Sequence, residues 1–415
     1  MKILLVNYRY FISGGPEKYM FNIKEMLEQE GHEVYPFSVH SNKNVPTEYD
    51  KYFVDPIGGR DVVYYDDYKK TPKTIMKLLS RSIYSFEVKR ALKRMIADVK
   101  PDIVYIIHFV NKLSPSVISA AREMHVPVVL RLSDYFMLCP RFDFLYDQRI
   151  CEDCLTGKYG SCIKKKCVKG SAFASAVRVF SMKVHKVIKI YDKVDAFVTP
   201  SGFLKEKLKQ SGIDEKKIHW IPTFYKGQPE EAVPAGQYGL YFGRISEEKG
   251  VEVLVKAYEK LGDDYQLKIV GDDSTALAVK LKQYVKDKKM HNVEFLGFRK
   301  GEALNECIRN SKYTFVPSIC YDNLPNAALE SFAFRKPVIA SNLGSLPELI
   351  TDGYNGLLFR TNDADDLARR VRELDDEIIR QMGENACQVL KERYSEKLHY
   401  TKLTELFEEV IRKKK

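Results

Sequence analysis

The sequence predicts an α/β protein built from two doubly wound domains, each a parallel β-sheet with helices on both faces. Apolar runs of strand length alternate with amphipathic helical patterns along the whole chain, which is typical of parallel sheets with two covered faces. The 415 residues exceed what one ordinary hydrophobic core accommodates. A polar segment rich in Pro and Gly, residues 222–237, separates the two halves of the pattern. We therefore expect an N-terminal domain over residues 1–222 and a C-terminal domain over residues 236–394.

The first half contains five runs that predict strands and two long patterns that predict helices. The opening run, within MKILLVNYRY, is short and has no cleavage-site pattern, so it indicates a first strand rather than a signal peptide. The predicted strands are residues 2–7, 33–39, 102–107, 126–132 and 196–201, and the predicted helices include residues 16–32 and 114–125.

The second half repeats the alternation with six strand-like runs. Because ligands of doubly wound sheets bind beyond the carboxyl ends of the strands, the residues that follow these runs are candidate site residues. The predicted strands are residues 238–243, 265–271, 293–297, 313–318, 337–341 and 356–359, and helices are expected to start near Gly250, Ser274, Lys300 and Pro325.

The composition is that of a folded globular protein, with 45% hydrophobic and 30% charged residues. No apolar run reaches the about 18 residues that cross a bilayer, so we expect a cytoplasmic protein. The net charge of +11 favours partners that carry negative charge. Residues 69–100 hold ten basic against two acidic residues, interleaved with apolar ones, and residues 177–194 are similar. This pattern favours peripheral contact with an anionic membrane, at its inner face; a solvated basic face over a core helix is the alternative.

Two glycines open the first predicted helix. Gly14 and Gly15 follow the strand at residues 2–7 and precede Pro16. Glycine lets a backbone approach a ligand closely, and the free N–H groups of a helix N-terminus suit an anion. The pair therefore indicates a phosphate-binding loop, with a simple tight turn as the alternative.

A pair of cations follows the first strand of the second half. Gly243 ends that strand, Arg244 follows it, and Lys249 comes five residues later, directly before the next helix. Arg offers a planar fork to phosphate oxygens, whereas Lys offers a mobile point charge. Together they indicate a clamp for a diphosphate. Gly271 and Phe298, after two further strands, support a nucleotide site, with Phe298 placed to pack beside a flat ring.

Two carboxylates mark the helix that is expected to start near Pro325. Asp322 lies in the loop before this helix, and Glu330 lies about one and a half turns inside it. Carboxylates accept hydrogen bonds from vicinal hydroxyls, whereas the N–H groups and dipole of a helix N-terminus suit phosphate. One element could therefore hold phosphate, ribose and sugar, although helix capping is an alternative for the first acid. The predicted start of this helix comprises Asn323 as its N-cap, Leu324, Pro325 and Asn326.

These residues resemble the retaining glycosyltransferases of family four, which adopt the GT-B fold. The resemblance covers nearly the whole chain and is strongest over residues 238–359. It implies two Rossmann-like domains facing each other across a cleft, and a C-terminal helix of about residues 395–415 that crosses back to complete the N-terminal domain. It further implies transfer of a sugar from a UDP- or GDP-sugar to a glycan or lipid-linked acceptor, in surface polysaccharide or glycoconjugate synthesis.

The resemblance also implies roles for individual residues. The family carries a Glu-x7-Glu motif that Asp322 and Glu330 match, so Glu330 is expected to hold the donor ribose and Asp322 to contact the donor sugar. Asp322 is one methylene shorter than the usual Glu. Arg244 and Lys249 match the family's diphosphate-binding pair and can offset the charge of the leaving diphosphate, so no catalytic metal is expected. Gly15 matches the glycine loop beside the donor phosphates.

The acceptor side departs from the family at one position. Many relatives have the sequence LHDY where this chain has RLSDYF, so Ser133 replaces a His that commonly meets the donor sugar. A general-base role at Ser133 is therefore not expected, which suits retaining transfer, in which the leaving diphosphate takes the acceptor proton. Asp134 and His108, each placed after a predicted strand, complete the predicted acceptor side.

Five of the eight cysteines fall within an insertion at residues 139–167. Four thiolates separated by two, seven and four residues suit tetrahedral zinc, and a cytoplasmic setting disfavours disulfides. Free or redox-active thiols and disulfides stay open as alternatives. The insertion is expected beside the cleft, as an acceptor-side loop. The predicted ligands of a structural zinc ion are Cys151, Cys154, Cys162 and Cys167, with Cys139 as a substitute.

Two other function classes stay open beside the transferase. A zinc-containing nucleic-acid-binding protein agrees with the basic stretches and the cysteines, but the chain has no recognition motif of that class, and Arg244, Lys249 and Glu330 would have no role. A nucleotide-sugar-binding protein without transfer activity is the other, because Ser133 and Asp322 depart from the family pattern. We expect a transferase that does not bind nucleic acid.

Overall fold

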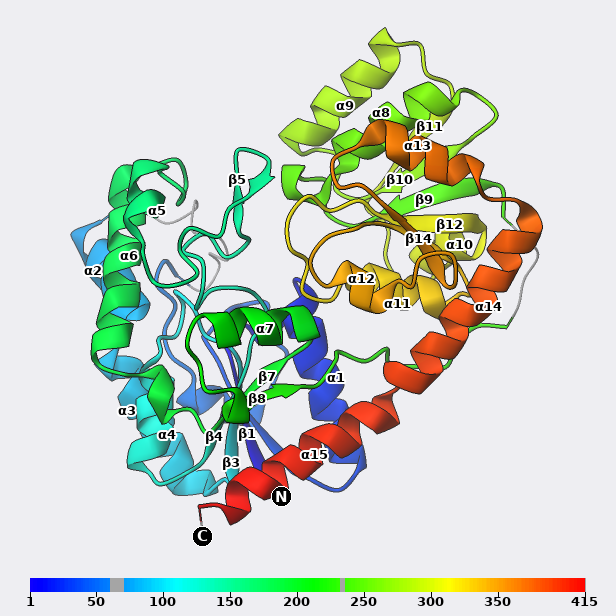
Figure 1. The fold of residues 1–415 in the computed structure, drawn as a ribbon. Helices are drawn as coiled ribbons and strands as arrows, with labels where there is room; N and C mark the ends of the chain where they lie inside the picture. The colour runs from blue at the N-terminus through cyan, green and yellow to red at the C-terminus, as the bar shows by residue number, and fades with distance from the viewer. Residues whose placement is uncertain (60–70, 232–235, 415) are drawn as a thin grey trace.

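The computed structural model describes residues 1–59, 71–231 and 236–414, and it contains two six-stranded parallel β-sheets covered by helices (Figure 1). Lys69 and Lys70 of the predicted basic stretch, and part of the predicted linker, lie outside these ranges. The N-terminal sheet has the order β2-β1-β3-β4-β7-β8. Its strands are β1 (Lys2–Asn7), β2 (Glu33–Phe37), β3 (Ile103–His108), β4 (Val128–Arg131), β7 (Ala196–Thr199) and β8 (Ile218–Trp220).

The helices around this sheet include the one predicted directly after the glycine pair. Gly14 is the N-cap of that helix, α1, and Pro16 lies in its first turn, where the missing N–H costs little. The insertion adds the two-residue strands β5 (Leu145–Tyr146) and β6 (Arg149–Ile150). The helices are α1 (Gly15–Gln29), η1 (Glu48–Tyr52), α2 (Pro72–Ile83), α3 (Phe86–Val99), α4 (Ser116–Glu123), α5 (Gly160–Lys164), α6 (Ala172–Val187), η3 (Tyr191–Lys193), α7 (Gly202–Gln210) and η4 (Glu215–Lys217).

The C-terminal sheet has the order β11-β10-β9-β12-β13-β14. All six of its strands were predicted. They are β9 (Tyr238–Phe242), β10 (Leu267–Val270), β11 (Val293–Gly297), β12 (Ser311–Val316), β13 (Val338–Ser341) and β14 (Gly356–Phe359). The helices that cover the sheet are η5 (Glu247–Lys249), α8 (Val251–Leu261), α9 (Ala276–Asp287), α10 (Glu302–Arg309), α11 (Asn326–Ala333), α12 (Leu346–Leu349), α13 (Ala364–Arg372) and α14 (Asp376–Arg393).

The strand order determines where each sheet can bind a ligand. In the N-terminal sheet the chain leaves β1 toward β2 and returns to the other side at β3; in the C-terminal sheet it leaves β9 toward β10 and returns at β12. At such switch points the loops on the two sides diverge, and a crevice opens at the carboxyl ends of the strands. The predicted site loops follow these central strands.

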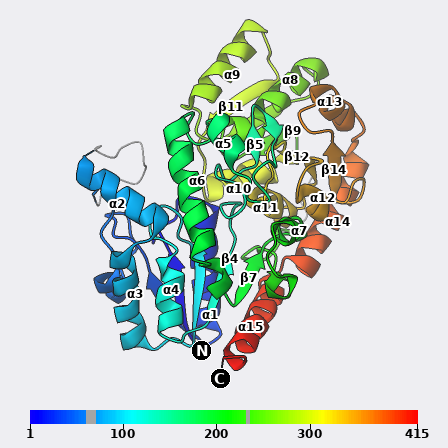
Figure 2. The ribbon, with the colours of Figure 1, turned by 60° about the vertical axis from the view of Figure 1, so that its left-hand side comes forward.

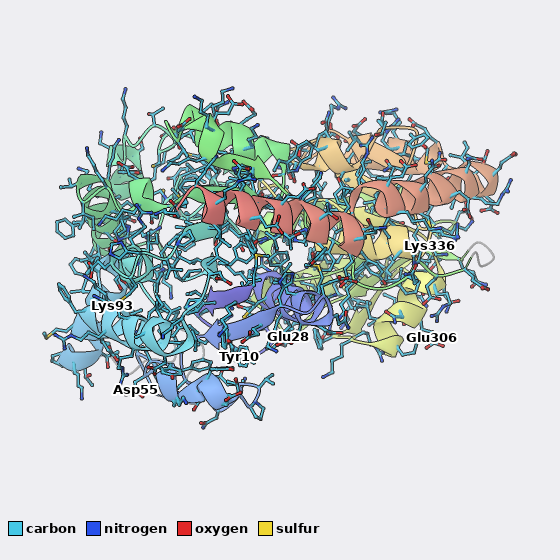
Figure 3. All side chains as sticks on the ribbon, turned by 90° about the horizontal axis from the view of Figure 1, so that it is seen from below. Tyr10, Glu28, Asp55, Lys93, Glu306 and Lys336 are labelled. Atoms are coloured by element: carbon cyan, nitrogen blue, oxygen red, sulfur yellow. The ribbon has the colours of Figure 1, made fainter. Side chains whose placement is uncertain are left out.

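The last helix, α15 (Glu396–Arg412), returns from the C-terminal domain to the N-terminal one, as predicted (Figure 1). Seen from below, it lies beside α1 (Figure 3). Leu403 and Phe407 are buried in the core that also contains Ile3 and Tyr105. No helix in the described ranges is long and apolar enough to cross a membrane.

The attachment of α15 makes the fold sensitive to acid through His399. This side chain is 3% exposed, and its ring nitrogens contact the Pro222 carbonyl oxygen at 2.6 Å and the Tyr19 hydroxyl at 3.0 Å. Burial lowers the pKa of His399 to about 3. In the unfolded chain His399 takes up a proton near pH 6.5, whereas the folded protein keeps it neutral. The contribution of His399 to the unfolding free energy is therefore present above about pH 6.5 and is lost as the pH falls toward about 3.

We expect His399→Gln to reduce this acid sensitivity. Between about pH 7 and about pH 5, the unfolding free energy of the wild type should fall by about 2 kcal/mol more than that of the variant. Urea unfolding at the two pH values measures this difference. His185, whose pKa burial lowers to about 4, is retained in both proteins and serves as the internal control. Equal losses in the two proteins would contradict the assignment to His399.

Candidate functional site

Loops at the carboxyl ends of the two sheets meet around Asn323. Its side-chain amide donates to the Leu132 carbonyl oxygen at 3.0 Å and accepts from the Ser201 hydroxyl at 3.0 Å, so it connects the loop after β12 to the loops after β4 and β7. The prediction of Asn323 as an N-cap is therefore wrong. The N-cap of α11 is Pro325, which makes no capping hydrogen bond; the amide of Asn323 is engaged by the opposite domain instead.

Asp322 and Lys249 form an ion pair beyond the carboxyl ends of β9 and β12. The Lys249 ammonium contacts the Asp322 carboxylate, which also accepts from the Ser318 hydroxyl. Both charged side chains are largely buried. Burial lowers the pKa of Lys249, but the charge of Asp322, the nearby Cys320 and the hydrogen bond to Asp322 together outweigh this effect and leave the pKa raised overall. Lys249 is therefore a permanent cation at neutral pH, held beside the acid by the fold.

Glu330 faces the N-terminal domain and pairs with Lys18. The Lys18 ammonium donates to a Glu330 carboxylate oxygen at 2.5 Å. Lys18 lies in the first turn of α1, directly after the glycine loop, and Glu330 lies in the second turn of α11. The sequence analysis missed Lys18. Its only signal was its place one turn beyond Gly15, which does not reveal the acid that it contacts.

The glycine loop lies close to the start of α11. A Cβ atom on Gly15 would lie 3.5 Å from the side-chain amide nitrogen of Asn326, so the backbone of this loop faces the helix N-terminus. Gly14 precedes it as the N-cap of α1. The two helix N-termini therefore present their free N–H groups near one another, an arrangement suited to phosphate groups. Leu324 and Pro325 are half-buried in the loop that leads into α11.

The glycines after β9 and β10 allow these strand ends to pack closely. Gly243 has φ 153°, and a Cβ atom on Gly271 would lie 2.3 Å from the Gly243 carbonyl oxygen, so a side chain on Gly271 would force these strand ends apart. Arg244 projects into solvent, with its side chain 75% exposed and 3.3 Å from Glu248. Phe298 is 70% exposed. The structure thus leaves a cation and an aromatic ring accessible beyond the carboxyl ends of β9 and β11.

The predicted acceptor-side residues lie at the carboxyl ends of β3 and β4. His108 Nε2 lies 3.1 Å from an Asp134 carboxylate oxygen, and the other Asp134 oxygen accepts from the Phe136 backbone N–H at 2.9 Å. The Ser133 hydroxyl accepts from Arg131 at 2.9 Å. Arg131 is 4% exposed and lies 3.8 Å from the centre of the Tyr19 ring. Ser133 is therefore held by a buried cation, which the sequence analysis did not identify.

The structure does not support the predicted zinc ion. The five cysteines of the insertion line one small cavity and are free thiols. Across the residues that the structure describes, however, no three Cys, His, Asp or Glu side chains are placed to hold a metal ion. Cys154 and Cys162 instead pack with Tyr159, Val179 and Met182 as small apolar side chains. The Cys151 sulfur accepts from the Lys165 ammonium at 3.3 Å.

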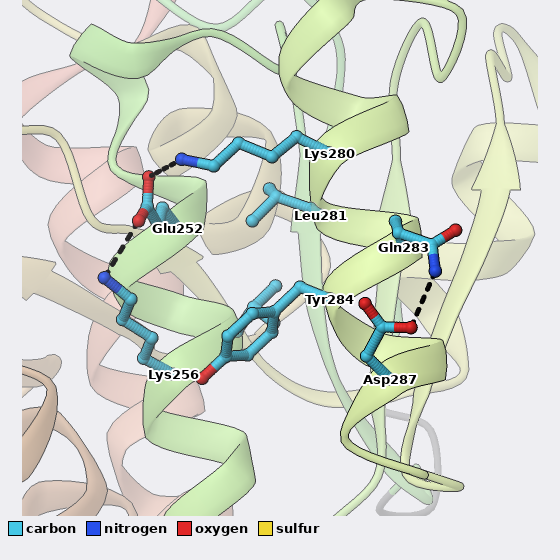
Figure 4. Close-up of a pocket in the computed structure, with 8 residues that line it drawn as sticks. Glu252, Lys256, Lys280, Leu281, Gln283, Tyr284 and Asp287 are labelled. Carbon is cyan, nitrogen blue, oxygen red and sulfur yellow. Dashed lines mark hydrogen bonds and ion pairs between the residues drawn. The ribbon is translucent and has the colours of Figure 1, made fainter.

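A separate surface groove of about 310 Å³ lies between α8 and α9 (Figure 4). Its polar side chains form ion pairs and hydrogen bonds with one another. Glu252 pairs with Lys256 at 2.8 Å and with Lys280 at 3.6 Å, and the Gln283 amide donates to Asp287 at 2.6 Å. Because its lining belongs to these two helices and not to the strand-end loops, we do not assign it to the site.

Two family models match the chain. The model "Glycosyl transferases group 1" matches residues 230–389, and the model "Glycosyltransferase Family 4" matches residues 13–136. An uncharacterized glycosyltransferase of Methanocaldococcus jannaschii is 30% identical over 202 residues, which are 48% of this chain and 55% of the relative. The chain spans about half the length of the first curated relatives that it matches, 55% and 40%.

Solved structures with the same architecture cover nearly the whole chain. Sucrose-phosphate synthase from Thermosynechococcus elongatus superimposes with a TM-score of 0.72 at 18% identity, covering 99% of both chains. HepE from Anabaena, solved in complex with UDP-glucose, has a TM-score of 0.65 at 15% identity and covers 98% of this chain and 99% of its own. The predicted GT-B architecture is confirmed.

Proposed function

This chain belongs to the glycosyl transferases group 1 family, and we propose that it moves a sugar, with retention of configuration, from a nucleotide-diphosphate donor to an acceptor. The observation that carries the proposal is the arrangement of Lys249, Asp322 and Glu330 beside the N-termini of α1 and α11. It combines cations and free N–H groups for phosphate with carboxylates for hydroxyl groups. The UDP-glucose complex of HepE supports a nucleotide-sugar donor, with UDP- or GDP-sugars as the first candidates.

Each part of the donor has a candidate partner. Glu330 holds the ribose, Asp322 contacts the transferred sugar, and Phe298 packs beside the base. Arg244 and Lys249 offset the charge that develops on the leaving diphosphate. The phosphates lie against the start of α11 and the glycine loop, where the residues proposed to line the donor site are Gly14, Gly15, Gly243, Gly271, Asn323, Leu324, Pro325 and Asn326.

The acceptor lies against the N-terminal domain, at His108, Ser133 and Asp134. We propose a glycan or a lipid-linked glycan. Because Arg131 holds the Ser133 hydroxyl, the leaving diphosphate, and not this hydroxyl, takes the acceptor proton. The two cations supply the positive charge that a catalytic metal supplies in other transferases. The proposed division assigns residues 1–222 with the last helix to the acceptor and residues 236–394 to the donor.

Turnover of UDP-, GDP- and ADP-sugars tests the proposal. We expect slow hydrolysis of one donor in the absence of acceptor. If that donor is α-linked, the released sugar should first appear as the α anomer. NMR measures the anomer before the sugar equilibrates. Release of the opposite anomer would contradict retention. If a donor binds in a thermal-shift assay but is not turned over, either alone or with a panel of glycan acceptors, the alternative of a nucleotide-sugar-binding protein is favoured.

A further inference from the structure

Helix α6 carries apolar side chains on two opposite faces. Val179 and Met182 on one face are buried within the N-terminal domain. On the other face, Phe173 is 80% exposed, Phe180 is 58% exposed and Val187 is 80% exposed. These three positions are seven residues apart, which is close to two helical turns, so their side chains lie on one line along the helix. Among the residues that the structure describes, this outward line is left exposed.

The neighbouring helix α2 adds further exposed apolar side chains. The C-terminal end of α2 is tied to α6 by hydrogen bonds, whereas the rest of α2 extends away from α6 in Figure 2. The Ser181 hydroxyl donates to the Ser82 carbonyl oxygen at 2.6 Å, and His185 Nε2 lies 2.8 Å from the Ile83 carbonyl oxygen. Ile75 is 48% exposed and Met76 is 72% exposed. We call these five side chains the α2–α6 face: Ile75, Met76, Phe173, Phe180 and Val187.

The two helices of the α2–α6 face carry basic but no acidic side chains, although Glu87 of α3 lies 3.8 Å from Lys77. Neither α2 nor α6 contains an Asp or a Glu. Lysines instead flank the apolar side chains, and those on α6 and just beyond it are exposed. These lysines are Lys73 and Lys77 on α2, Lys183 and Lys186 on α6, and Lys189 after it.

Single exposed apolar side chains are normal on a protein surface, but several gathered on adjoining helices mark an interaction site. We propose that the α2–α6 face docks on an anionic lipid bilayer. The Phe and Val side chains would enter the boundary between headgroups and acyl chains, while the lysines would contact lipid phosphates. The absence of acids from both helices favours this occupant, because an acid would be repelled by an anionic surface.

The same helix connects the docking face to the proposed acceptor side. From the inner side of α6, the Arg178 guanidinium donates to the Phe136 carbonyl oxygen at 2.8 Å, two residues after Asp134. The docked face and this backbone are therefore separated by about one helix diameter, roughly 10 Å. Docking would bring the acceptor side close to the bilayer, where a lipid-linked glycan would be presented. This last step depends on the proposed function, whereas the docking itself does not.

Vesicle co-sedimentation of the full chain tests the docking. We expect the wild type to bind vesicles of equal parts phosphatidylcholine and phosphatidylglycerol, and to bind phosphatidylcholine vesicles much more weakly. We expect binding to the mixed vesicles to be weakened about tenfold or more in the triple variant Phe173→Ser, Phe180→Ser and Val187→Ser. Val279→Ser, at a 57% exposed position on α9, is the matched control and should bind like the wild type.

A charge variant distinguishes binding through contacts with lipid phosphates from binding through apolar contacts alone. Lys183→Gln with Lys186→Gln should weaken binding to the mixed vesicles and reduce its dependence on salt. Sedimentation velocity tests a second copy of the chain as the occupant. Loss of a dimer in the triple variant, with vesicle binding unchanged, would overturn the proposal, as would wild-type vesicle binding by both variants.

Donor hydrolysis in solution distinguishes a failure of this inference from a failure of the proposed function. The triple variant changes only exposed side chains, so it should keep the wild-type melting temperature and the wild-type rate of donor hydrolysis. If this rate is retained while vesicle binding falls, the docking surface is confirmed. If donor hydrolysis is absent from the wild type while vesicle binding follows the expected pattern, the docking surface stands and the proposed function does not.

Discussion

Replacing Glu330 by Gln is expected to weaken donor binding by about 100-fold. In the proposed donor site, the two carboxylate oxygens accept hydrogen bonds from the vicinal hydroxyls of the ribose, whereas an amide offers one acceptor and a donor group in its place. Isothermal titration calorimetry with the donor identified in the turnover screen measures the change. The melting temperature should change little, because the Glu330–Lys18 pair is partly exposed and contributes about 1 kcal/mol or less.

Lys18→Met provides the matched control for this prediction. It removes the same ion pair while retaining the carboxylate, and the donor no longer has to displace the Lys18 ammonium from Glu330. We therefore expect equal or tighter donor binding by Lys18→Met. If Glu330→Gln binds the donor as tightly as the wild type does, the ribose assignment is wrong. If both variants lose affinity equally, the ion pair and not the carboxylate supports the donor site.

Replacing Lys249 by Met is expected to lower the turnover number by about 100- to 1,000-fold, the range seen when one preorganised charge-stabilising group is removed. In the proposed donor site the Lys249 ammonium faces the diphosphate, whose negative charge grows as the bond to the sugar breaks. Loss of the cation should therefore affect the turnover number more than the affinity for the intact donor. Steady-state kinetics at saturating donor measure this effect.

The same substitution also leaves Asp322 in a largely buried position without its cation, which is expected to lower the unfolding free energy by about 3 kcal/mol. The double variant Lys249→Met with Asp322→Asn removes the unpaired charge, so its stability should recover while its turnover stays low. Recovery of turnover in the double variant would show that Lys249 acts on folding alone and would contradict its proposed role in the transfer step.

The strands could be predicted from the sequence because most of them are short apolar runs buried on both faces. β9, β12 and β13 contain almost only buried residues. β8 was missed because it has three residues and lies at a sheet edge, where Ile218 is buried but Trp220 is 48% exposed. Pairing with β7 forms this strand, whose own sequence is too short to show a strand pattern.

The candidate site was only partly predictable. Asp322 and Lys249 could be selected because each lies in a loop between a strand and a helix, and local pattern reveals such positions. Glu330, inside α11, could be selected because it matches the second acid of the family motif. Lys18 could not be matched to Glu330, from which it is separated by 312 residues. Asn323 has the local sequence of an N-cap, but contacts with the other domain engage its amide.

The sequence by itself determined the alternation of strands and helices, and it placed Arg244, Lys249 and Asp322 near strand ends, because periodicity and turn residues act within a few positions of the chain. The tertiary structure alone decided which charges pair across the two domains, and that the five cysteines surround one cavity without converging on a metal position. It also decided which apolar face of α6 is buried. These outcomes depend on packing between distant segments, and both faces of α6 have the same helical period, so no local pattern distinguishes them.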